Sequence, residues 1–358
     1  MNALTIESVK VASDRHPTQR PECDGTLCWD STTMVHVEVT AGEQTGWGYT
    51  YSDAAAAKLI DGKMKPLLLG GDPMSVRNHF QAMVKEIRNL GRPGIASTAI
   101  SAIDIALWDL KAKLLGVPLV DLLGRVRENV PVYGSGGFTS YTDNELIEQM
   151  SRWVKGGINR VKMKVGRNPP EDLRRVGVVR DAIGDADLYV DANGAYDRKQ
   201  AIQFAVEFSK LGVTWFEEPV SSDDLVGLRL NRDANIPGME ITAGEYGYHN
   251  DYFLRMLSAG AVDVLQADAT RCGGVTGFLQ VATLAEAFHV PLSSHCAPAL
   301  HAHLGCVVPG LRHIEYFHDH VQIERGILGG FREPEHGMIR PPQDHSGFGW
   351  CRINLSSS

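Results

Sequence analysis

From Val130 onward, short apolar, β-branched segments alternate with longer amphipathic ones, and this alternation constrains the fold more than any other feature. Eight short segments keep the rhythm: VPVYGSG, RVKMKVG, LYVDANG, VTWFEEP, MEITAGE, VDVLQAD, VPLSSHC and RHIEY. The segments between the first four predict helices that end near Gly156, Gly184 and Leu211. Strands that alternate with helices at this spacing form βαβ units and a parallel sheet. Eight of them in one run favour a closed barrel, and the absence of G-x-G-x-x-G after the first strand argues against a Rossmann fold.

The first ~120 residues predict a smaller α+β unit in front of the barrel. Residues 3–11 and 33–39 alternate apolar and polar side chains, as half-buried strands do. The segment 16–25 between them is rich in Pro and Gly, and it predicts a loop. Residues 97–115 carry an apolar stripe along one side of a helix that ends at Gly116 and Pro118.

Composition argues against several classes of function. Lys and Arg number 35 and Asp and Glu number 43, so the net charge is −8, whereas a nucleic-acid-binding protein normally presents a basic face. We see no signal peptide and no apolar stretch near the ~18 residues that span a bilayer, so no membrane partner is expected. Six cysteines without a C-x-x-C pair predict reduced, mostly buried thiols in a cytoplasmic protein.

Ionisable residues lie at the carboxyl end of one predicted strand after another. They are Lys162, Lys164, Asp191, Glu217, Glu245, Asp268, His295 and Glu315. Successive positions from the second lysine onward are separated by 27, 26, 28, 23, 27 and 20 residues. This spacing approaches the length of one βα unit, since about 250 residues over eight units gives about 31. In a barrel all these strand ends open onto one face, so residues far apart in the chain are expected to meet there.

Three of these residues, Asp191, Glu217 and Glu245, follow adjacent predicted strands. Carboxylates forced together repel and raise one another's pKa unless a cation lies among them. Ligation by oxygen alone favours a hard cation, Mg²⁺ first and Mn²⁺ second. The alternative is a set of structural acids paired with Arg or Lys.

These segments resemble the enolase superfamily, in particular its mandelate racemase-like subgroup of acid-sugar dehydratase type. The matching motifs are RVKMKVG, DANGAY, WFEEP, ITAGE, QADATRCGG, SSHCAP and HIEY, and SAIDIALWDLKAKLLGVPLVDLLG resembles the hinge into the barrel. The resemblance implies an α/β fold, a modified (β/α)7β TIM-type barrel with an N-terminal α+β capping domain. The implied division is a capping domain over 1–125, the barrel over 126–320 and a segment over 321–358 that returns to the capping domain.

The resemblance also implies roles for the strand-end residues. One Mg²⁺ per active site, or Mn²⁺ in its place, is held by the three carboxylates. Lys164 is the base on one face of the substrate's α-carbon, and Lys162 neutralises a carboxylate oxygen and helps depress the pKa of Lys164. His295 is the acid or base on the opposite face, held in its tautomer by Asp268. Glu315, if protonated, donates a short hydrogen bond to the substrate carboxylate.

Residues for the distal part of the substrate are expected outside the strand ends. Asn193 either reaches a substrate hydroxyl or carboxylate or serves as a turn residue in D-x-N-G. Loops of the capping domain over 14–30 and 47–53 are expected to add Arg20, Trp29 and Tyr49. Their polar character suits a polyhydroxylated chain better than an aromatic ring.

We therefore expect an enzyme that removes the α-proton of a hydroxy-carboxylate to give an enediolate. The first choice is β-elimination of water to a 2-keto-3-deoxy acid, as in aldonate and aldarate dehydratases. Racemisation or epimerisation of a 2-hydroxy acid is the alternative, and a non-catalytic scaffold on the same fold is the third. The expected partner is a small-molecule carboxylate, and the chain is expected to form a homo-oligomer.

Overall fold

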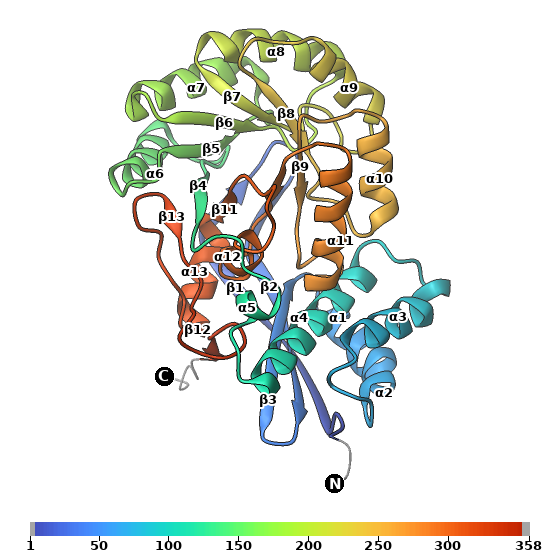
Figure 1. Ribbon diagram of the computed structural model, residues 1–358. Coiled ribbons are helices and arrows are strands. Elements are labelled where there is room, and N and C mark those ends of the chain that lie inside the picture. Colours follow the sequence, from blue (N-terminus) through green and yellow to red (C-terminus); the bar gives the residue numbers. More distant parts are fainter. Residues whose placement is uncertain (1–3, 353–358) are drawn as a thin grey trace.

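The computed structural model describes residues 4–352, and it has an N-terminal domain, a parallel barrel and a C-terminal segment (Figure 1). The N-terminal domain contains β1 (Ser8–Cys23), β2 (Cys28–Ala41), β3 (Gln44–Tyr51), α1 (Ala55–Leu59), η1 (Ile60–Met64), α2 (Lys65–Leu68), α3 (Val76–Glu86), η2 (Ile87–Asn89), α4 (Ile95–Leu115) and α5 (Leu119–Leu122). Its three strands form an antiparallel sheet in the order β1-β2-β3. None of the helices over residues 4–352 is long and apolar enough to cross a membrane.

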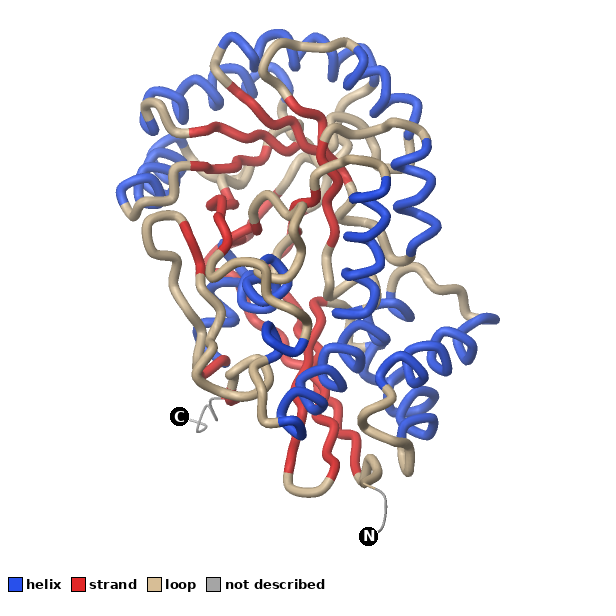
Figure 2. The backbone as a smooth tube through the Cα atoms, in the orientation of Figure 1, coloured by secondary structure: helices blue, strands red, loops and turns tan. Residues whose placement is uncertain are grey.

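The barrel has eight parallel strands, which confirms the predicted fold class. The strands are β4 (Val130–Gly136), β5 (Arg160–Lys164), β6 (Asp187–Asp191), β7 (Val213–Glu217), β8 (Glu240–Ala243), β9 (Val264–Ala267), β10 (Leu292–Ser294) and β11 (Ile314–Phe317). The helices between them are α6 (Asp143–Lys155), α7 (Pro169–Ile183), α8 (Arg198–Lys210), α9 (Leu225–Asp233), α10 (Asn250–Ser258), α11 (Gly274–Ala287) and α12 (Pro298–Gly305). Figure 2 shows these helices around the strands.

The barrel closes where β10 meets the segment that leads into β11. Leu292 forms a parallel bridge with Leu311, and the amide of Ser294 donates a hydrogen bond to the carbonyl of His313 at 3.3 Å. Neighbouring strands pair in a register that sets Lys164 beside Asp191, and Asp191 beside Glu217. Strand-end residues from separate βα units therefore become direct neighbours.

Alternate residues along each strand point into the barrel and form layers. One layer is aromatic, with Tyr189 stacked on Trp215 at 5.1 Å between ring centroids and Tyr133 packed against both. Two residues further along the same strands come Asp191 and Glu217. The aromatic layer thus forms an apolar floor beneath a charged layer at the strand ends.

The long helix α4 joins the N-terminal sheet to the barrel, and it ends at Gly116 in a left-handed conformation, as predicted. A Cβ on Gly46 or Gly48 would overlap carbonyl oxygens of this helix, so only glycine lets β3 approach it so closely. Helix α4 also contacts the N-terminus of α11, where Asp104 of α4 accepts a hydrogen bond from the amide of Thr276 at 2.8 Å.

The predicted loop over 16–25 is wrong, because β1 runs from Ser8 to Cys23 and pairs with β2 over most of this length. Its register shifts between Pro17 and Glu22, so the prolines fall at an irregularity. Because β1 is an edge strand, a residue without an amide hydrogen costs few ladder hydrogen bonds there. Residue 3 of the predicted strand 3–11 lies outside the described residues.

The prediction that all six cysteines are reduced is also wrong. Cys23 and Cys28 are direct partners in the β1–β2 register and form a disulfide. Cys272, Cys296 and Cys306 are buried free thiols, as expected, and Cys351 is free and exposed. Cysteine usage therefore no longer indicates a reducing compartment.

The C-terminal segment contains α13 (His318–Ile327), β12 (Leu328–Gly329), β13 (Met338–Ile339) and β14 (Cys351–Arg352). Strand β13 pairs antiparallel with the start of β4. Further along, the amide of Phe348 donates to Asp109 of α4 at 2.9 Å, and Trp350 packs against Trp47 of β3. In Figure 1 this segment, drawn in red, lies beside β4 and extends toward the N-terminal sheet.

Candidate active site

The charged layer at the carboxyl ends of the barrel strands gathers the predicted residues. Lys162, Lys164, Asp191, Glu217, Asp268 and Glu315 are buried within their strands or directly after them, as are Glu245 and His295. They come from seven strands, β5 to β11, and lie in one connected set of ion pairs, in which His295 and Glu315 at 3.9 Å join the two halves.

Three carboxylates in this layer could hold a metal ion. One oxygen from each of Asp191, Glu217 and Glu245 lies within 4.8 Å of the others. Oε2 of Glu245 is buried without a hydrogen-bond partner in the described part of the chain, although Nε2 of His295 lies 3.4 Å away. A set of carboxylate oxygens that includes such an atom fits a hard divalent cation.

Other side chains orient the same carboxylates. The indole Nε1 of Trp215 donates to Oε2 of Glu217 at 2.9 Å, and the amide of Asn193 donates to Oδ1 of Asp191 at 2.9 Å. Arg271 lies 3.5 Å from Oε1 of Glu245. Groups that orient ligands in this way are typical of metal sites.

The two lysines of β5 form ion pairs with these carboxylates. Nζ of Lys162 lies 2.6 Å from Oε1 of Glu217 and 2.8 Å from Oε1 of Glu315. Nζ of Lys164 lies 2.5 Å from Oδ2 of Asp191. Lys162 thus links the carboxylate cluster to Glu315 on β11.

The crowding of charge shifts the pKa values in opposite directions. Burial and the charge of Asp191 raise the pKa of Glu217 well above its ordinary value. Burial also raises the pKa of Asp191, but the charges of Lys164 and Lys162 outweigh it and lower the pKa overall. The cluster therefore shows the mutual repulsion that a bound cation would relieve.

The pKa of Lys164 was expected to be lowered, but in this structure it is raised. Burial lowers this pKa and the charge of Lys162 acts in the same direction, but the carboxylate of Asp191 outweighs both and the net shift is upward. The physical reason is the close ion pair with Asp191. A cation among the carboxylates would compete for that oxygen and weaken the pairing.

The hydrogen bond expected from Glu315 required a protonated carboxyl, and the structure does not meet this condition. Burial raises the pKa of its carboxyl, but the charges of Lys162 and His295 outweigh burial and hold the pKa well below its ordinary value. Its Oε2 accepts a hydrogen bond from the amide of Cys296 at 2.8 Å. Glu315 is therefore an ionised partner of Lys162.

His295 and Asp268 form a buried pair across the barrel from Lys164. Nδ1 of His295 lies 2.8 Å from Oδ2 of Asp268, whose other oxygen accepts hydrogen bonds from the amide and hydroxyl of Thr270, both at 2.7 Å. Burial raises the pKa of Asp268, but its hydrogen bond to His295 and the charges around it lower the pKa overall. An ionised Asp268 accepts the Nδ1 proton, so Nε2 faces the other charged residues.

The thiol of Cys296 is buried, and its Sγ lies 3.2 Å from Nε2 of His295. Burial raises the pKa of this thiol well above its ordinary value, so it stays protonated. Cys296 and Ala297 have φ angles of 52° and 42°, a left-handed turn that brings the chain from β10 into α12.

Two positioning residues had not been assigned from the sequence. Arg271 bridges the layer, with Nε 3.6 Å from Asp268 and Nη1 3.5 Å from Glu245. His301 accepts a hydrogen bond from the amide of Ala269 at Nε2 and contacts the carbonyl of Cys296 with Nδ1 at 2.7 Å. Arg271 stands within the QADATRCGG motif, which could have identified it, whereas His301 could not be separated from its neighbouring histidines.

The four residues predicted for substrate binding lie in different places. Asn193 borders the carboxylate cluster, and its Oδ1 is buried with no hydrogen-bond partner between residues 4 and 352. Trp29 packs on Phe138 at the barrel mouth. Its Nε1 donates to Asp319 at 3.0 Å, beside a buried Glu22 whose pKa is raised to about 10 by burial and by Asp319.

Tyr49 and Arg20 are engaged elsewhere. Tyr49 is fully buried and donates a hydrogen bond to Glu324 at 2.6 Å, so its hydroxyl faces the domain junction. Arg20 forms an ion pair with Glu145 of α6 and lies over the ring of Tyr141. The structure does not bring these two side chains to the charged layer.

The turn that joins β1 to β2 covers the barrel mouth. A Cβ on Gly25 would overlap the carbonyl oxygens of Ala192 and Val165, at the ends of β6 and β5. The hydroxyl of Thr139, after β4, donates to the carbonyls of Cys23 and Asp24 at 3.0 and 2.8 Å. The disulfide closes this turn at its base.

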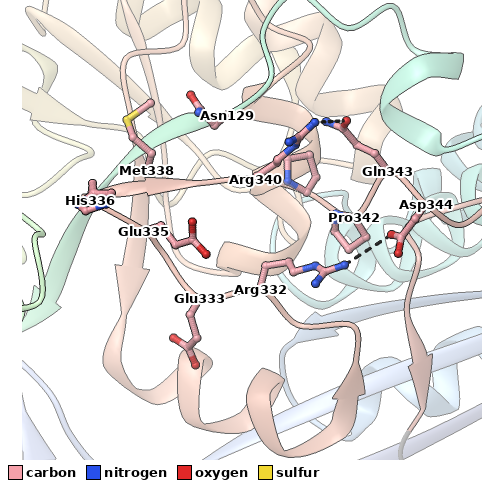
Figure 3. Close-up of a pocket in the computed structure, with 11 residues that line it drawn as sticks. Asn129, Arg332, Glu333, Glu335, His336, Met338, Arg340, Pro342, Gln343 and Asp344 are labelled. Atoms are coloured by element: carbon pink, nitrogen blue, oxygen red, sulfur yellow. Dashed lines mark hydrogen bonds and ion pairs between the residues drawn. The ribbon is translucent and has the colours of Figure 1, made fainter.

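The barrel has a cavity near each of its two ends. The larger, of about 790 Å³, is lined by the C-terminal segment and Asn129 at the start of β4, the end of the barrel opposite the charged layer. Its residues pair among themselves, as Arg332 with Asp344 and Arg340 with Gln343 do in Figure 3. The smaller, of about 580 Å³, borders Asn193 at the charged layer.

Two protein-family models match most of the chain. Residues 5–124 match the mandelate racemase/muconate lactonizing enzyme N-terminal domain, and residues 145–350 match the enolase C-terminal domain-like family. The chain is 35% identical over 325 residues to a 3,6-anhydro-alpha-L-galactonate cycloisomerase of Streptomyces coelicolor, across 85% of this chain and 88% of that protein.

Solved structures are similar over nearly the full length. A mandelate racemase/muconate lactonizing enzyme-like protein from Rubrobacter xylanophilus has a TM-score of 0.95 and 49% identity, covering 97% of both chains. An L-talarate/galactarate dehydratase from Salmonella typhimurium, liganded with Mg and L-lyxarohydroxamate, has a TM-score of 0.89 and 30% identity, covering 99% of this chain and 92% of that one.

Proposed function

Because the chain belongs to the enolase superfamily, in its mandelate racemase-like subgroup, we propose that it is a Mg²⁺-dependent acid-sugar dehydratase. In this proposal it removes the α-proton of a hydroxy-carboxylate and then eliminates the β-hydroxyl as water to form a 2-keto-3-deoxy acid. The observation that carries the proposal is the gathering of three carboxylates, two lysines and a His–Asp pair in one buried layer. Similarity to a talarate/galactarate dehydratase solved with Mg supports it.

Lys164 is the proposed base at the α-carbon. It lies on β5 while His295 follows β10, and we propose that the two side chains act on opposite faces of the bound substrate. An unprotonated amine removes the α-proton, and the electron pair of the C–H bond enters the carboxylate system as an enediolate. Lys162 lies beside the carboxylate positions and offsets part of the developing charge.

His295 is the proposed general acid at the β-oxygen. Its Nε2 donates a proton to the leaving hydroxyl while the enediolate electron pair forms the new C–C double bond, so the net loss is one water. The resulting enol tautomerises to the 2-keto-3-deoxy acid. The carboxylate of Asp268 at 2.8 Å stabilises the imidazolium that donates this proton.

The proposed ligands of the cation are Asp191, Glu217 and Glu245. A bound Mg²⁺ would stabilise the negative charge that develops on the substrate carboxylate when the α-proton leaves. Asn193, beside this cluster, is proposed to bind a substrate hydroxyl. Arg20, Trp29 and Tyr49 are proposed to act by shaping the domain junction rather than by touching substrate.

A library of aldonic and aldaric acids tests the function. With Mg²⁺ present, at least one acid should yield a 2-keto acid detected as its semicarbazone, and EDTA should abolish the product. A chain that forms no keto acid and exchanges no α-proton with D₂O from any acid in the library would exclude the proposal.

Epimerisation of a 2-hydroxy acid is the second candidate. It is favoured by the arrangement of Lys164 and His295 on opposite sides of the layer, since an epimerase needs a base on each face. Inversion of the α-centre without keto acid in the same assay would select it.

Three further predictions accompany this function. We propose a capping domain over 1–125, a barrel over 126–320 and a returning segment over 321–358, supported by the contacts of Phe348 and Trp350 with the N-terminal domain. A homo-oligomeric state and a cytoplasmic location stay predictions.

A further inference from the structure

A second group of metal-ligating side chains lies where β1 of the N-terminal domain meets α13. Glu22 belongs to β1, and His318 and Asp319 are the first two residues of α13. Each of the three residues offers one ligand atom, and these atoms lie within 4.8 Å of one another. None of the three takes part in the ion pairs that connect the charged layer. The group is therefore a separate cluster, formed by segments from opposite ends of the chain.

The two carboxyl groups of this cluster are buried together. Glu22 is 1% exposed and Asp319 is 6% exposed. The hydroxyl of Tyr141 donates to Oε1 of Glu22 at 3.3 Å, and Nε1 of Trp29 donates to Oδ2 of Asp319 at 3.0 Å. No lysine or arginine between residues 4 and 352 forms an ion pair with either carboxyl. Two buried carboxylates without a basic partner repel each other, so they need a proton or a cation between them.

One oxygen of this pair lacks a partner and belongs to a residue beside a cavity. Oε2 of Glu22 is buried and accepts no hydrogen bond from the described residues. A cavity of about 70 Å³ adjoins Glu22, and it is lined by all three cluster residues, by 16–19, by Thr32 and by 322–323. This volume can hold a metal ion and a water molecule. A buried oxygen without a partner costs about 1–3 kcal/mol, so its position beside such a cavity points to a ligand.

The set of donor atoms favours one class of cation. An imidazole with two carboxylates suits Zn²⁺, which is commonly held by three protein ligands with water in the fourth position. Mg²⁺ and Ca²⁺ prefer oxygen ligands alone, as in the three-carboxylate cluster of the charged layer. The competing occupant is a proton, because burial and Asp319 raise the pKa of Glu22 to about 10. A proton shared by the two carboxyls leaves the imidazole of His318 without a role, whereas Zn²⁺ uses all three side chains.

We propose that Glu22, His318 and Asp319 form a second metal site, which binds Zn²⁺ in preference to Mg²⁺ and leaves one position open to water. The bound ion connects β1 to α13, and it fastens the N-terminal domain to the segment that follows the last barrel strand. Tyr141 and Trp29 orient its carboxylate ligands, as groups around a metal site commonly do. This site does not depend on the proposed function, which uses only the charged layer.

Zinc binding in the presence of excess Mg²⁺ tests the site. Mg²⁺ competes for the carboxylates of the charged layer, so the zinc that the protein retains after dialysis, counted by mass spectrometry, reports on sites that prefer zinc. Wild-type protein should retain about one zinc ion per chain. His318→Gln should weaken zinc binding by at least about 10- to 100-fold, the loss that follows removal of a group that merely orients a ligand. His345→Gln, the same change at an exposed position, is the matched control and should bind zinc as wild type does.

Glu22→Gln separates a zinc ion from a shared proton. The amide keeps the size of the side chain and can still accept the hydrogen bond from Tyr141, but the anionic ligand is lost. Zn²⁺ should raise the thermal midpoint of the wild-type protein, because a ligand that binds only the folded state stabilises it, and should raise that of Glu22→Gln much less. If the carboxyls hold only a proton, Zn²⁺ should shift both midpoints equally or not at all. His318 is only partly buried, so His318→Gln keeps the test informative if Glu22→Gln does not fold.

Two results would overturn the second metal site. One is a wild-type protein that retains no zinc under these conditions. The other is equal retention of zinc by the wild type and both variants. Such zinc would lie at another set of ligands, of which His295, Cys296 and Glu315 lie close enough together. Keto acid formation with Mg²⁺ alone tests the proposed function independently, so either hypothesis can fail without the other.

Discussion

Replacing Asp268 with Asn tests the role of the buried His–Asp pair most directly. Oδ1 of Asp268 accepts two hydrogen bonds from Thr270 at 2.7 Å, and Oδ2 lies 2.8 Å from Nδ1 of His295. In the variant, the amide oxygen keeps Thr270, so the amide nitrogen faces His295 and can only donate to it. The imidazole then carries its proton on Nε2 when neutral and loses its anionic partner when charged.

The magnitude follows from one buried hydrogen bond to a charged group, worth about 1.5–3 kcal/mol. At 1.36 kcal/mol for each factor of ten, proton donation by His295 should slow by about 10- to 150-fold. The free energy of unfolding should change little, because the substituted side chain still accepts hydrogen bonds from Thr270 and remains a hydrogen-bonding neighbour of His295.

Formation of 2-keto acid and α-proton exchange in D₂O are the two measurements. Asp268→Asn should suppress keto acid formation and keep the exchange that depends on Lys164. Asp185→Asn, on the exposed turn before β6, is the matched control and should behave as wild type. Keto acid formation within twofold of wild type in a folded Asp268→Asn protein would refute the assigned role.

Three other predictions concern the metal, the two faces and the pH. Mg²⁺ at 100 times its dissociation constant should raise the free energy of unfolding of the wild-type protein by about 2.7 kcal/mol, which is measured as a rise in the thermal midpoint. Glu217→Gln should reduce that rise. An equal rise in both proteins would exclude this carboxylate as a ligand. Lys164→Ala and His295→Asn should each lose turnover yet exchange the α-proton of opposite epimers of one acid in D₂O, and full activity in both variants would contradict their assignment. Burial raises the pKa of Asp104 to about 7, whereas an Asp in an unfolded chain has a pKa near 3.9. The folded state therefore keeps this proton to higher pH than the unfolded state. As the pH rises from about 4 to about 7, the contribution of Asp104 to the free energy of unfolding should fall by roughly 4 kcal/mol. Denaturant titrations of Asp104→Asn should show a shallower fall across that window, and an identical slope would contradict the pKa shift.

The barrel and its charged layer could be predicted because they depend on local pattern and regular geometry. Residues two apart on a strand share a face, and parallel strands of a barrel end on the same side. Those two rules are sufficient to bring Asp191, Glu217 and His295 together from positions far apart in the chain. The helix ends at Gly116, Gly156 and Gly184 followed from the same local signals.

What the pattern could not decide is which long-range partner each side chain meets. Tyr49 looked available from its exposed-loop context, but the tertiary structure buries it against Glu324, 275 residues away. The role expected for Glu315 required a protonated carboxyl, but the contact with Lys162 holds the pKa of that carboxyl below its ordinary value. A pKa depends on every charge within several ångströms, and those neighbours come from other strands.

The N-terminal hairpin illustrates the same division. Pro17 and Pro21 locally predict a loop, but an edge strand tolerates residues without amide hydrogens, and whether β1 is an edge is a property of the whole sheet. Cys23 and Cys28 can pair because the register of β1 with β2 sets them opposite each other. The architecture and the chemical groups at the barrel mouth could be predicted, because they follow from periodicity along one chain. Their protonation, the covering of the mouth and the cavity beside it could not, because these arise from contacts between segments that the periodicity does not relate.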